Sequence, residues 1–376
     1  MEQLISEKNV NCGRQFEFDC VKFFAILYMV CIHIYENLSN VVDYSTYPDT
    51  VLRIAVEFLG GPLAAPVFMF AMGVGMIYTR HSEWIDFVKR GIKLLILGYV
   101  LSFFKMPFYM ILGKFIGLEY DSAKFTFLDS MLVVDILQFA GMAFIVIGLM
   151  KRFKLSSLTM LVISVVIQAA GIWATKLELF NSLTGLLLGL ILPTHVMSAF
   201  PLTLWLIYPV AGMCFAELLR KVTDKKRFYQ RTLLIGLLGF VSLSSGLMWY
   251  GFDLRSFFAL KDEIYYFQSF PTSIWTLCVV ITAISICWLL FSKLENTKVG
   301  TLFKFFSTNL NTIYIIQWII ITFFLYISTE TEFKIVFSQE ALIPAALALV
   351  IISALITVPI VQIKKSRRKN REAKQN

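Results

Sequence analysis

Long apolar runs separated by short polar segments make up most of this chain. Runs of about 20 mostly apolar residues, the length that crosses a bilayer as a helix, recur along its whole length. This pattern predicts an all-α polytopic membrane helix bundle of about ten spans, in one domain over residues 1–363 that a basic tail, 364–376, follows. The predicted spans lie near residues 18–37, 57–79, 91–112, 128–150, 155–175, 200–219, 232–252, 271–292, 305–327 and 340–362.

A shorter run, "LTGLLLGLILPTH" (183–195), is either an eleventh span or a re-entrant helix. With ten spans and a cytoplasmic N-terminus, most of the 34 Lys and Arg residues fall in cytoplasmic segments, as the positive-inside rule requires. An eleventh span would move the basic stretch "RKVTDKKRFYQR" to the outside. We therefore predict cytoplasmic termini and a 183–195 segment that stays on the outer side without crossing.

Composition agrees with a membrane protein. The 376 residues are 58% hydrophobic and only 16% charged, against about 25% charged in soluble domains. The net charge of +9 sits beside apolar spans, where it faces anionic lipid, so we do not expect nucleic-acid binding. The six cysteines form neither a metal-like nor a disulfide-like spacing, and we expect packing thiols and no metal. We also expect the first apolar run to remain as a span, since it lacks a cleavage site.

The first span, "DCVKFFAILYMVCIH", carries charge that is expensive in lipid. Lys22 and His33 are eleven residues apart, about three helical turns, and therefore project in nearly the same direction. Asp19 lies three residues before Lys22, and Asn37 lies four residues after His33, so both share this face. Such a stripe predicts a helix face turned to a protein interior or a watery cavity. Snorkelling of Lys22, or a plain interhelical hydrogen bond from His33, would explain each residue alone.

These residues resemble a known pattern. The sequence D-x-x-K-F-x-A-I, followed by a histidine eleven residues after the lysine, is similar to the first helix of the transmembrane acyltransferases. That superfamily includes the acyltransferase-3 proteins and the heparan-α-glucosaminide N-acetyltransferases. Phe23 stands where the family usually has glycine. "GGPLAAPVFMFAMGVGMIYTRH" resembles the second family span, and "VKRGIKLLILGYVLSF" resembles the basic start of the third.

Later segments are also similar but depart from the pattern. "VVDILQFAGMAFIVIGLM" resembles the fourth span, where Phe139 replaces a basic residue after Gln138. "FPLTLWLIYPVAGMCFAELL" and "STNLNTIYIIQW" resemble later segments, and Gln317 stands where relatives often have histidine. The resemblance covers most of the chain and implies acyl transfer. A scaffold that kept the fold and lost activity stays possible because of these two departures.

Acyl transfer needs a base, oxyanion stabilisation and a positioned donor. Neutral histidine suits the base near pH 7, and the family pattern favours His33, as general base or acyl carrier, over the rival His195. His81, at the start of a cytoplasmic loop, is expected to be solvated. The candidate catalytic set is His33, Asp19, Lys22 and Asn37.

The resemblance implies acyl-CoA, most simply acetyl-CoA, as a donor that arrives from the cytoplasm. CoA carries several phosphate charges, which basic side chains bind well. The candidates are Arg14, Lys89, Arg90 and Lys93, with Lys22 beside them. Ordinary positive-inside residues explain the same cluster. The pantetheine arm would then carry the acyl group along the first span toward His33.

Buried polar residues in later spans are candidates to line this channel, although interhelical hydrogen bonds explain most of them equally well. They are Asp135, Gln138, Asn309, Asn311, Tyr314 and Gln317. Gly73 and Gly75 are expected only to allow close helix packing.

The resemblance implies a sugar or cell-envelope glycan as acceptor, and a bacterial plasma membrane as the location. Tyr44, Tyr47, Tyr265 and Tyr266 could stack on sugar rings, although an interfacial tyrosine belt explains them as well. A polar stripe through the bilayer would also suit a transporter or flippase without covalent chemistry. Transporters often show inverted repeats, and none is visible in this sequence.

Overall fold

The computed structural model describes residues 4–39, 50–117, 126–177, 182–195, 197–259, 265–330 and 333–372. The regular structure of these residues is helical, and their β-type contacts are isolated bridges. The helices of the first half are α1 (Phe16–Leu38), α2 (Val51–Gly60), α3 (Ala65–Tyr78), α4 (Trp84–Lys105), α5 (Pro107–Ile116), α6 (Phe127–Met131), α7 (Ile136–Arg152) and α8 (Ser157–Ala174). Those of the second half are α9 (Leu183–Leu188), α10 (Leu202–Trp205), α11 (Ile207–Arg220), α12 (Lys225–Trp249), η1 (Leu254–Phe257), α13 (Phe270–Phe291), η2 (Ser292–Leu294), α14 (Lys298–Thr308), α15 (Leu310–Glu330) and α16 (Gln339–Glu372).

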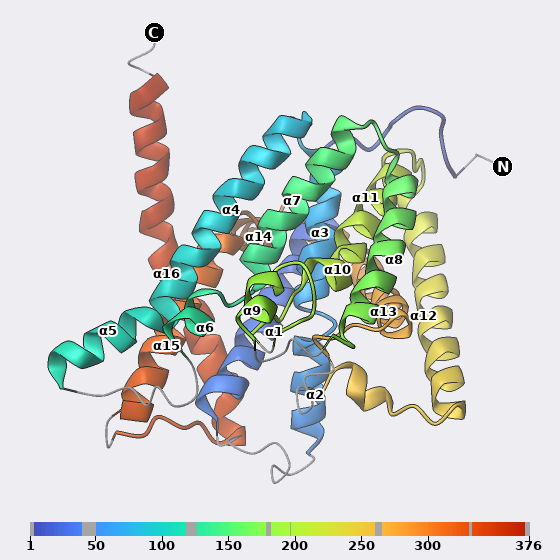
Figure 1. Ribbon diagram of the computed structural model, residues 1–376. Coiled ribbons are helices and arrows are strands. Elements are labelled where there is room, and N and C mark those ends of the chain that lie inside the picture. Colours follow the sequence, from blue (N-terminus) through green and yellow to red (C-terminus); the bar gives the residue numbers. More distant parts are fainter. Residues whose placement is uncertain are drawn as a thin grey trace.

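Nine helical segments among the described residues are long and apolar enough to span a membrane. They correspond to nine of the predicted spans, and the tenth, predicted near 128–150, is α7 with the short α6 before it. At 17 residues α7 is about 25 Å long, close to the thickness of the hydrocarbon core. Antiparallel packing against α4 holds it in the bundle (Figure 1). The predicted all-α membrane bundle is confirmed.

Several spans are broken where proline or glycine interrupts the helix. The second span breaks between Gly60 and Ala65, around Pro62, and the third breaks at Met106, before Pro107. Proline lacks the backbone N–H and disfavours helical geometry at the preceding residue. The span predicted near 305–327 is present as α15, but it starts later than predicted, because α14 ends at Thr308 and α15 starts after Asn309. The breaks after Gly60 and at Asn309 border the cavities described below.

The 183–195 segment does not cross the bundle. Its helix, α9, has six residues and would reach about 9 Å, far less than a bilayer requires. The chain then turns back on itself, since the Thr194 hydroxyl donates to the Gly185 carbonyl oxygen at 2.9 Å. A bridge between Val134 and Ser198 attaches the following strand-like residues to the segment before α7. The predicted short non-crossing helix is therefore present.

Helix α1 lies inside the bundle and packs against α2, α3 and α13–α16 (Figure 1). The segment before it is attached to the α11–α12 connection, where the amide of Ser6 donates to Lys221 O at 2.7 Å. The basic stretch 220–231, which joins α11 to the first turns of α12, thus lies at the same end of the bundle as the start of α1. Helix α16 also runs toward that end and carries the first residues of the predicted basic tail as its last turns (Figure 1).

Candidate functional site

Two cavities lie in line along α1. The larger has a volume of about 260 Å³ and is lined by Lys22, near the start of the helix. The smaller has a volume of about 50 Å³ and is lined by His33, about 16 Å of helical rise further on. Four residues line both cavities and so form their common wall: Met29, Phe68, Ile136 and Tyr314. Of the four residues of the predicted polar face, Lys22 and His33 therefore border two adjoining cavities.

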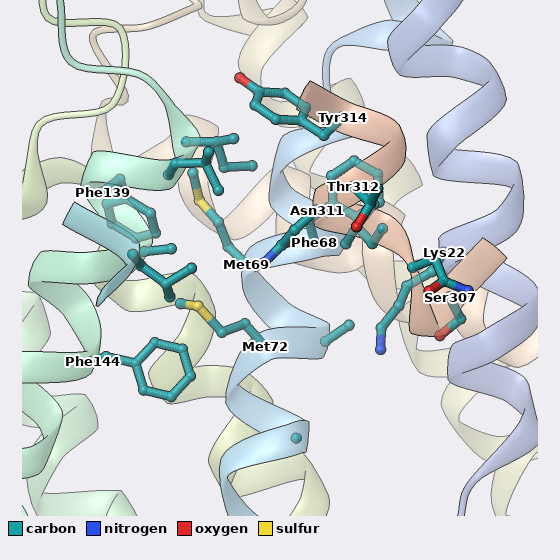
Figure 2. A pocket seen from close by; sticks show the side chains of 18 of the residues that line it. Lys22, Phe68, Met69, Met72, Phe139, Phe144, Ser307, Asn311, Thr312 and Tyr314 are labelled. Atoms are coloured by element: carbon teal, nitrogen blue, oxygen red, sulfur yellow. The ribbon is translucent and has the colours of Figure 1, made fainter. Parts of the chain in front are cut away.

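The larger cavity is cationic at one end and apolar along its walls. Lys22 and Arg90 supply the charge, and Arg90 is held over the Phe144 ring with its guanidinium carbon 4.6 Å from the centroid. Figure 2 shows side chains from α1, α3, α7 and α15 converging on this space, with Ser307 from the end of α14. The break at Asn309 turns Thr308, Asn311 and their neighbours toward the cavity. Phe139 contributes an apolar wall.

In the smaller cavity the His33 ring is fixed from α15. Its Nδ1 lies 2.9 Å from Gln317 Nε2 and 3.3 Å from Gln317 Oε1, so the amide hydrogen-bonds this nitrogen. The ring also packs on Trp318, with centroids 4.3 Å apart. Gln317 itself is fully buried and Trp318 nearly so. Two successive residues of α15 thus hold the imidazole by one nitrogen, which leaves Nε2 without a partner among the described residues.

An ion pair borders His33. Lys105 Nζ lies 3.0 Å from Asp135 Oδ2, and the Tyr314 hydroxyl donates to the same oxygen at 2.6 Å. The ammonium also sits over the Trp318 ring, 3.5 Å from its centroid. Asp135 is the N-cap of α7 and accepts from the amide of Ile136. Because its carboxylate is paired three ways, Asp135 is a fixed anion in the wall of the smaller cavity.

Of the four predicted catalytic residues, the structure brings Lys22 and His33 to the cavities. Asp19 is nearly fully buried and takes two hydrogen bonds from Arg14, at 2.6 and 2.7 Å. The hydrogen bond to Asp19 raises the pKa of Arg14. Asn37 donates to the His33 carbonyl oxygen at 2.8 Å and stabilises the last turns of α1. Asp19 and Asn37 are therefore satisfied locally and line neither cavity.

The predicted phosphate-binding cluster is divided. Arg90 lines the larger cavity, whereas Lys89 and Lys93 are exposed and line neither cavity, and Arg14 is held by Asp19. Only Arg90 and Lys22 of the predicted basic set are in place to meet a ligand in the larger cavity. The role of both residues stays a prediction.

The predicted channel-lining residues line different cavities, and some of them line neither. Asn309, Asn311 and Tyr314 line the larger cavity, and Asp135 lines the smaller. Gln138 lines neither, because its amide completes the capping box of α7 and donates to Ser102 at 2.8 Å. Gln317 lines neither cavity, but it hydrogen-bonds His33, which lines the smaller one.

The remaining histidines lie elsewhere. His81 is exposed, as predicted. His195 accepts from the Met197 amide through Nδ1, and its Nε2 lies 3.9 Å from Asp129. Burial lowers the pKa of His195, and the nearby Asp129 charge opposes this shift. These contacts tie the α9 segment to α6 and give His195 a packing role.

Among the predicted aromatic residues, Tyr265 and Tyr266 line the smaller cavity, while Tyr44 and Tyr47 lie outside the described residues. The two glycines of α3 differ. A Cβ on Gly73 would fall 1.8 Å from Pro209 O, which confirms close packing of α3 on α11. A Cβ on Gly75 would meet nothing within 4 Å, and Gly75 borders the larger cavity, so its predicted packing role is wrong.

Sequence reasoning missed three residues beside His33. Lys105 and Trp318 lie on α4 and α15, far from His33 in the sequence, and no local sequence pattern places them beside His33. Glu36 lines the smaller cavity and accepts a hydrogen bond from the Tyr266 hydroxyl at 3.4 Å. Its signal was available, because a carboxylate three residues after His33 shares the same helix face.

Comparison with protein families gives one match. The family model described as "Acyltransferase domain", of the acyltransferase-3 family, matches residues 15–362, almost the whole chain. No curated protein and no solved structure was found to match the chain. The match spans α1 to α16 and so includes both cavities. The chain therefore belongs to the acyltransferase-3 family of integral membrane acyltransferases.

Proposed function

We propose that this protein moves an acyl group, most simply acetyl, from cytosolic acyl-CoA to a hydroxyl or amine of an extracytoplasmic sugar, such as a cell-envelope glycan. The location that fits this activity is a bacterial plasma membrane, with both termini in the cytoplasm. O-acetylation of an envelope polysaccharide is the simplest form of the reaction.

One observation carries this proposal: a cationic cavity and a histidine cavity adjoin inside one helix bundle. Lys22 and Arg90 suit the phosphates of CoA, and the methionine and phenylalanine walls between them and Tyr314 suit a flexible pantetheine arm. The acyl thioester would then reach the common wall of the two cavities. His33 lies directly beyond that wall.

In the direct route, Nε2 of His33 takes the proton of the acceptor hydroxyl while its oxygen attacks the thioester carbonyl carbon. The tetrahedral intermediate collapses, the C–S bond breaks, and the CoA sulfur leaves as thiolate and receives the proton from the imidazolium. In the carrier route, Nε2 attacks the thioester carbonyl carbon, the C–S bond breaks and CoA leaves as a thiolate. The acceptor oxygen then attacks the acyl-imidazole, the C–N bond breaks, and the acceptor proton passes to the CoA thiolate. The Tyr314 hydroxyl, on the common wall, and the Lys105 ammonium both hydrogen-bond Asp135 beside His33. We assign them to stabilising the oxyanion, with the single Tyr314 hydroxyl proton turning from Asp135 to the oxyanion as it forms.

Gln317 would set the tautomer of His33. When its Oε1 accepts from Nδ1–H, the lone pair on Nε2 is free to take a proton or attack a carbonyl. This role matches the position of Gln317, where many relatives carry histidine.

The size of the smaller cavity favours a short acyl group. About 50 Å³ is the space of very few water-sized groups, which admits an acetyl carbon skeleton and one acceptor hydroxyl but not a long chain. The pantetheine arm of the donor would need to fit in the larger cavity. Only the carbonyl carbon of the acyl group would approach His33.

The test is envelope glycan acylation in cells with and without the protein, measured by mass spectrometry, together with CoA release from acetyl-CoA by the purified protein. We expect added acetyl groups on envelope sugars and thiol release that requires the protein. The same line of cavities would also suit a permeation path. Transport of an envelope precursor with no thioester cleavage at all would contradict the proposal and favour a flippase.

A further inference from the structure

We propose that Glu36 is the acceptor-binding residue, and that the carboxylate and Tyr266 form a polyol subsite on the far side of His33 from the larger cavity. This inference rests on the proposed function and adds the residue that positions its second substrate. Glu36 belongs neither to the predicted catalytic set nor to the predicted channel lining.

Two carboxylates line the smaller cavity, and they differ in how they are paired. Asp135 is bound to Lys105 and Tyr314, as described above. Glu36 forms no ion pair with a lysine or arginine among the described residues, and its one hydrogen bond is the long contact from Tyr266. Its side chain is partly exposed although it lies inside the bundle, because it faces the cavity. A carboxylate in such a place has acceptor capacity left for a ligand.

The aromatic side of this subsite is built rigidly. The Tyr265 hydroxyl donates to the Gly61 carbonyl oxygen at 2.9 Å, and Trp205 Nε1 donates to the Tyr266 carbonyl oxygen at 3.1 Å. The Tyr266 ring also packs edge-on against Phe200, which lines the same cavity. Contacts from Gly61 at the end of α2, from α10 and from the segment before α10 thus hold the two tyrosines in place.

An acidic oxygen beside fixed aromatic rings matches the chemistry of a sugar. The cavity of about 50 Å³ takes sugar hydroxyls and not a whole ring, so a hydroxyl donates to the carboxylate while the C–H groups beside it meet the aromatic residues. Because Glu36 and His33 are three residues apart on one helix, a hydroxyl bound by Glu36 places its neighbour on the ring toward the imidazole. The subsite therefore favours neutral or amino sugars and disfavours anionic acceptors through charge repulsion.

The test uses the full chain with Glu36→Gln, Glu36→Asp and His33→Ala, and with Glu340→Gln as the matched control. Glu340 is an exposed glutamate in the first turn of α16 that lines neither cavity, so its substitution removes the same charge outside them. Three quantities are measured at equal membrane levels: acetyl groups on envelope glycans, acetyl-CoA binding by purified protein, and hydrolysis of acetyl-CoA to acetate and CoA.

We expect Glu36→Gln to lower glycan acetylation at least tenfold while acetyl-CoA binding stays within twofold of wild type. Hydrolysis by water, which needs no sugar, should persist, so the ratio of hydrolysis to transfer rises about tenfold. Glu36→Asp should restore part of the transfer, since it keeps the charge. His33→Ala should lose both hydrolysis and transfer, and Glu340→Gln should match wild type.

Equal transfer by wild type and Glu36→Gln would overturn the inference and leave the proposed function standing. Parallel loss of hydrolysis and transfer in Glu36→Gln, without rescue by aspartate, would overturn it as well, because it would indicate a general structural role. A wild-type protein that neither acetylates glycans nor cleaves acetyl-CoA would remove the proposed function, and the inference with it.

Discussion

The two cavities along α1 differ in size, charge and construction. The larger is about five times the volume of the smaller and carries the cations Lys22 and Arg90 on flexible side chains. The smaller contains His33 and two carboxylates, and short hydrogen bonds and ring contacts from α7 and α15 fix its walls. One cavity can adapt to a long polyanion, and the other holds a few groups in defined positions.

This difference separates binding from chemistry. Energy gained in the larger cavity is gained equally in the ground state and the transition state, so it should affect KM. Groups in the smaller cavity meet the reacting atoms, so they should affect kcat. Each of the following substitutions tests whether that division is correct.

The largest effect is expected for His33→Ala. Removal of a general base lowers the rate by about 10²–10⁴-fold, and removal of an acyl carrier would lower it further. The protein should still insert and bind acetyl-CoA, since His33 makes one side-chain hydrogen bond. Acyl transfer and donor binding by the purified protein check this expectation.

The control is His81→Ala, an exposed histidine outside both cavities. It should leave transfer unchanged. Full activity in His33→Ala, or equal losses in the two variants, would remove the imidazole from the mechanism.

The second effect is a weaker affinity for the donor when Lys22 and Arg90 are both replaced by methionine. A hydrogen bond to a charged group contributes about 1.5–3 kcal/mol, so acetyl-CoA should bind about 10–100-fold more weakly for each phosphate hydrogen bond that the substitutions remove. The turnover number at saturating donor should change little. Donor binding by titration, together with kcat, separates the two quantities.

Lys89→Met is the matched control, because Lys89 is adjacent in sequence to Arg90 but exposed outside the cavity. An equal loss of affinity in this variant would mean that overall surface charge, and not the cavity, attracts the donor. A large fall in kcat without a change in donor binding would contradict the division between the cavities.

Helix α1 shows how much of the fold can be predicted from the sequence. Its ends were predicted within two residues, because an uninterrupted apolar run marks a span directly. The breaks at Met106 and Asn309 were not predicted, although Pro107 signals the first of them. Asn309 carries no comparable signal, and the α14–α15 break depends on how these helices pack on α1.

Only part of the site was predicted, because a sequence pattern within one helix does not show which other helices pack against it. Helical periodicity puts Lys22 and His33 on one face, and the structure places both at the cavities. The same periodicity included Asp19 and Asn37, whose partners are Arg14 and a backbone carbonyl. Periodicity indicates which direction a side chain takes, but not which distant residue meets it. Lys105 and Trp318 were missed because their contacts join α4, α7 and α15.

A third, intermediate effect is expected at the common wall. Tyr314→Phe removes the 2.6 Å hydrogen bond to Asp135 and leaves a nearly isosteric ring. In the proposed role this hydroxyl turns from Asp135 to the oxyanion in the transition state. That bond would also have a charged acceptor, worth about 1.5–3 kcal/mol, so we expect kcat to fall about 10-fold or more. Acetyl-CoA binding should stay the same. Steady-state kinetics with purified protein provide the measurement.

Tyr28→Phe is a suitable control, because it removes a hydroxyl from the same helix as His33 at a position that borders neither cavity. A change in donor affinity alone after Tyr314→Phe would assign this tyrosine to the larger cavity only, and the oxyanion role would then be wrong.

The smallest effect is expected at Gly75, and it tests whether the larger cavity is open space. An added Cβ there meets nothing within 4 Å, and alanine favours a helix over glycine by about 0.5–1 kcal/mol. Gly75→Ala should therefore fold at least as well as wild type and weaken acetyl-CoA binding by no more than a few-fold. Gly75→Leu should fill more of the cavity and weaken donor binding further, with kcat retained.

Gly73→Ala gives the contrast two residues away on the same helix. Its Cβ would lie 1.8 Å from Pro209 O, so α3 and α11 must separate, and thermal stability in detergent should fall. If Gly75→Ala destabilised the protein as strongly as Gly73→Ala, there would be no open space beside Gly75. The donor would then need another path to His33, because the cationic end of the larger cavity would no longer connect to the histidine chamber.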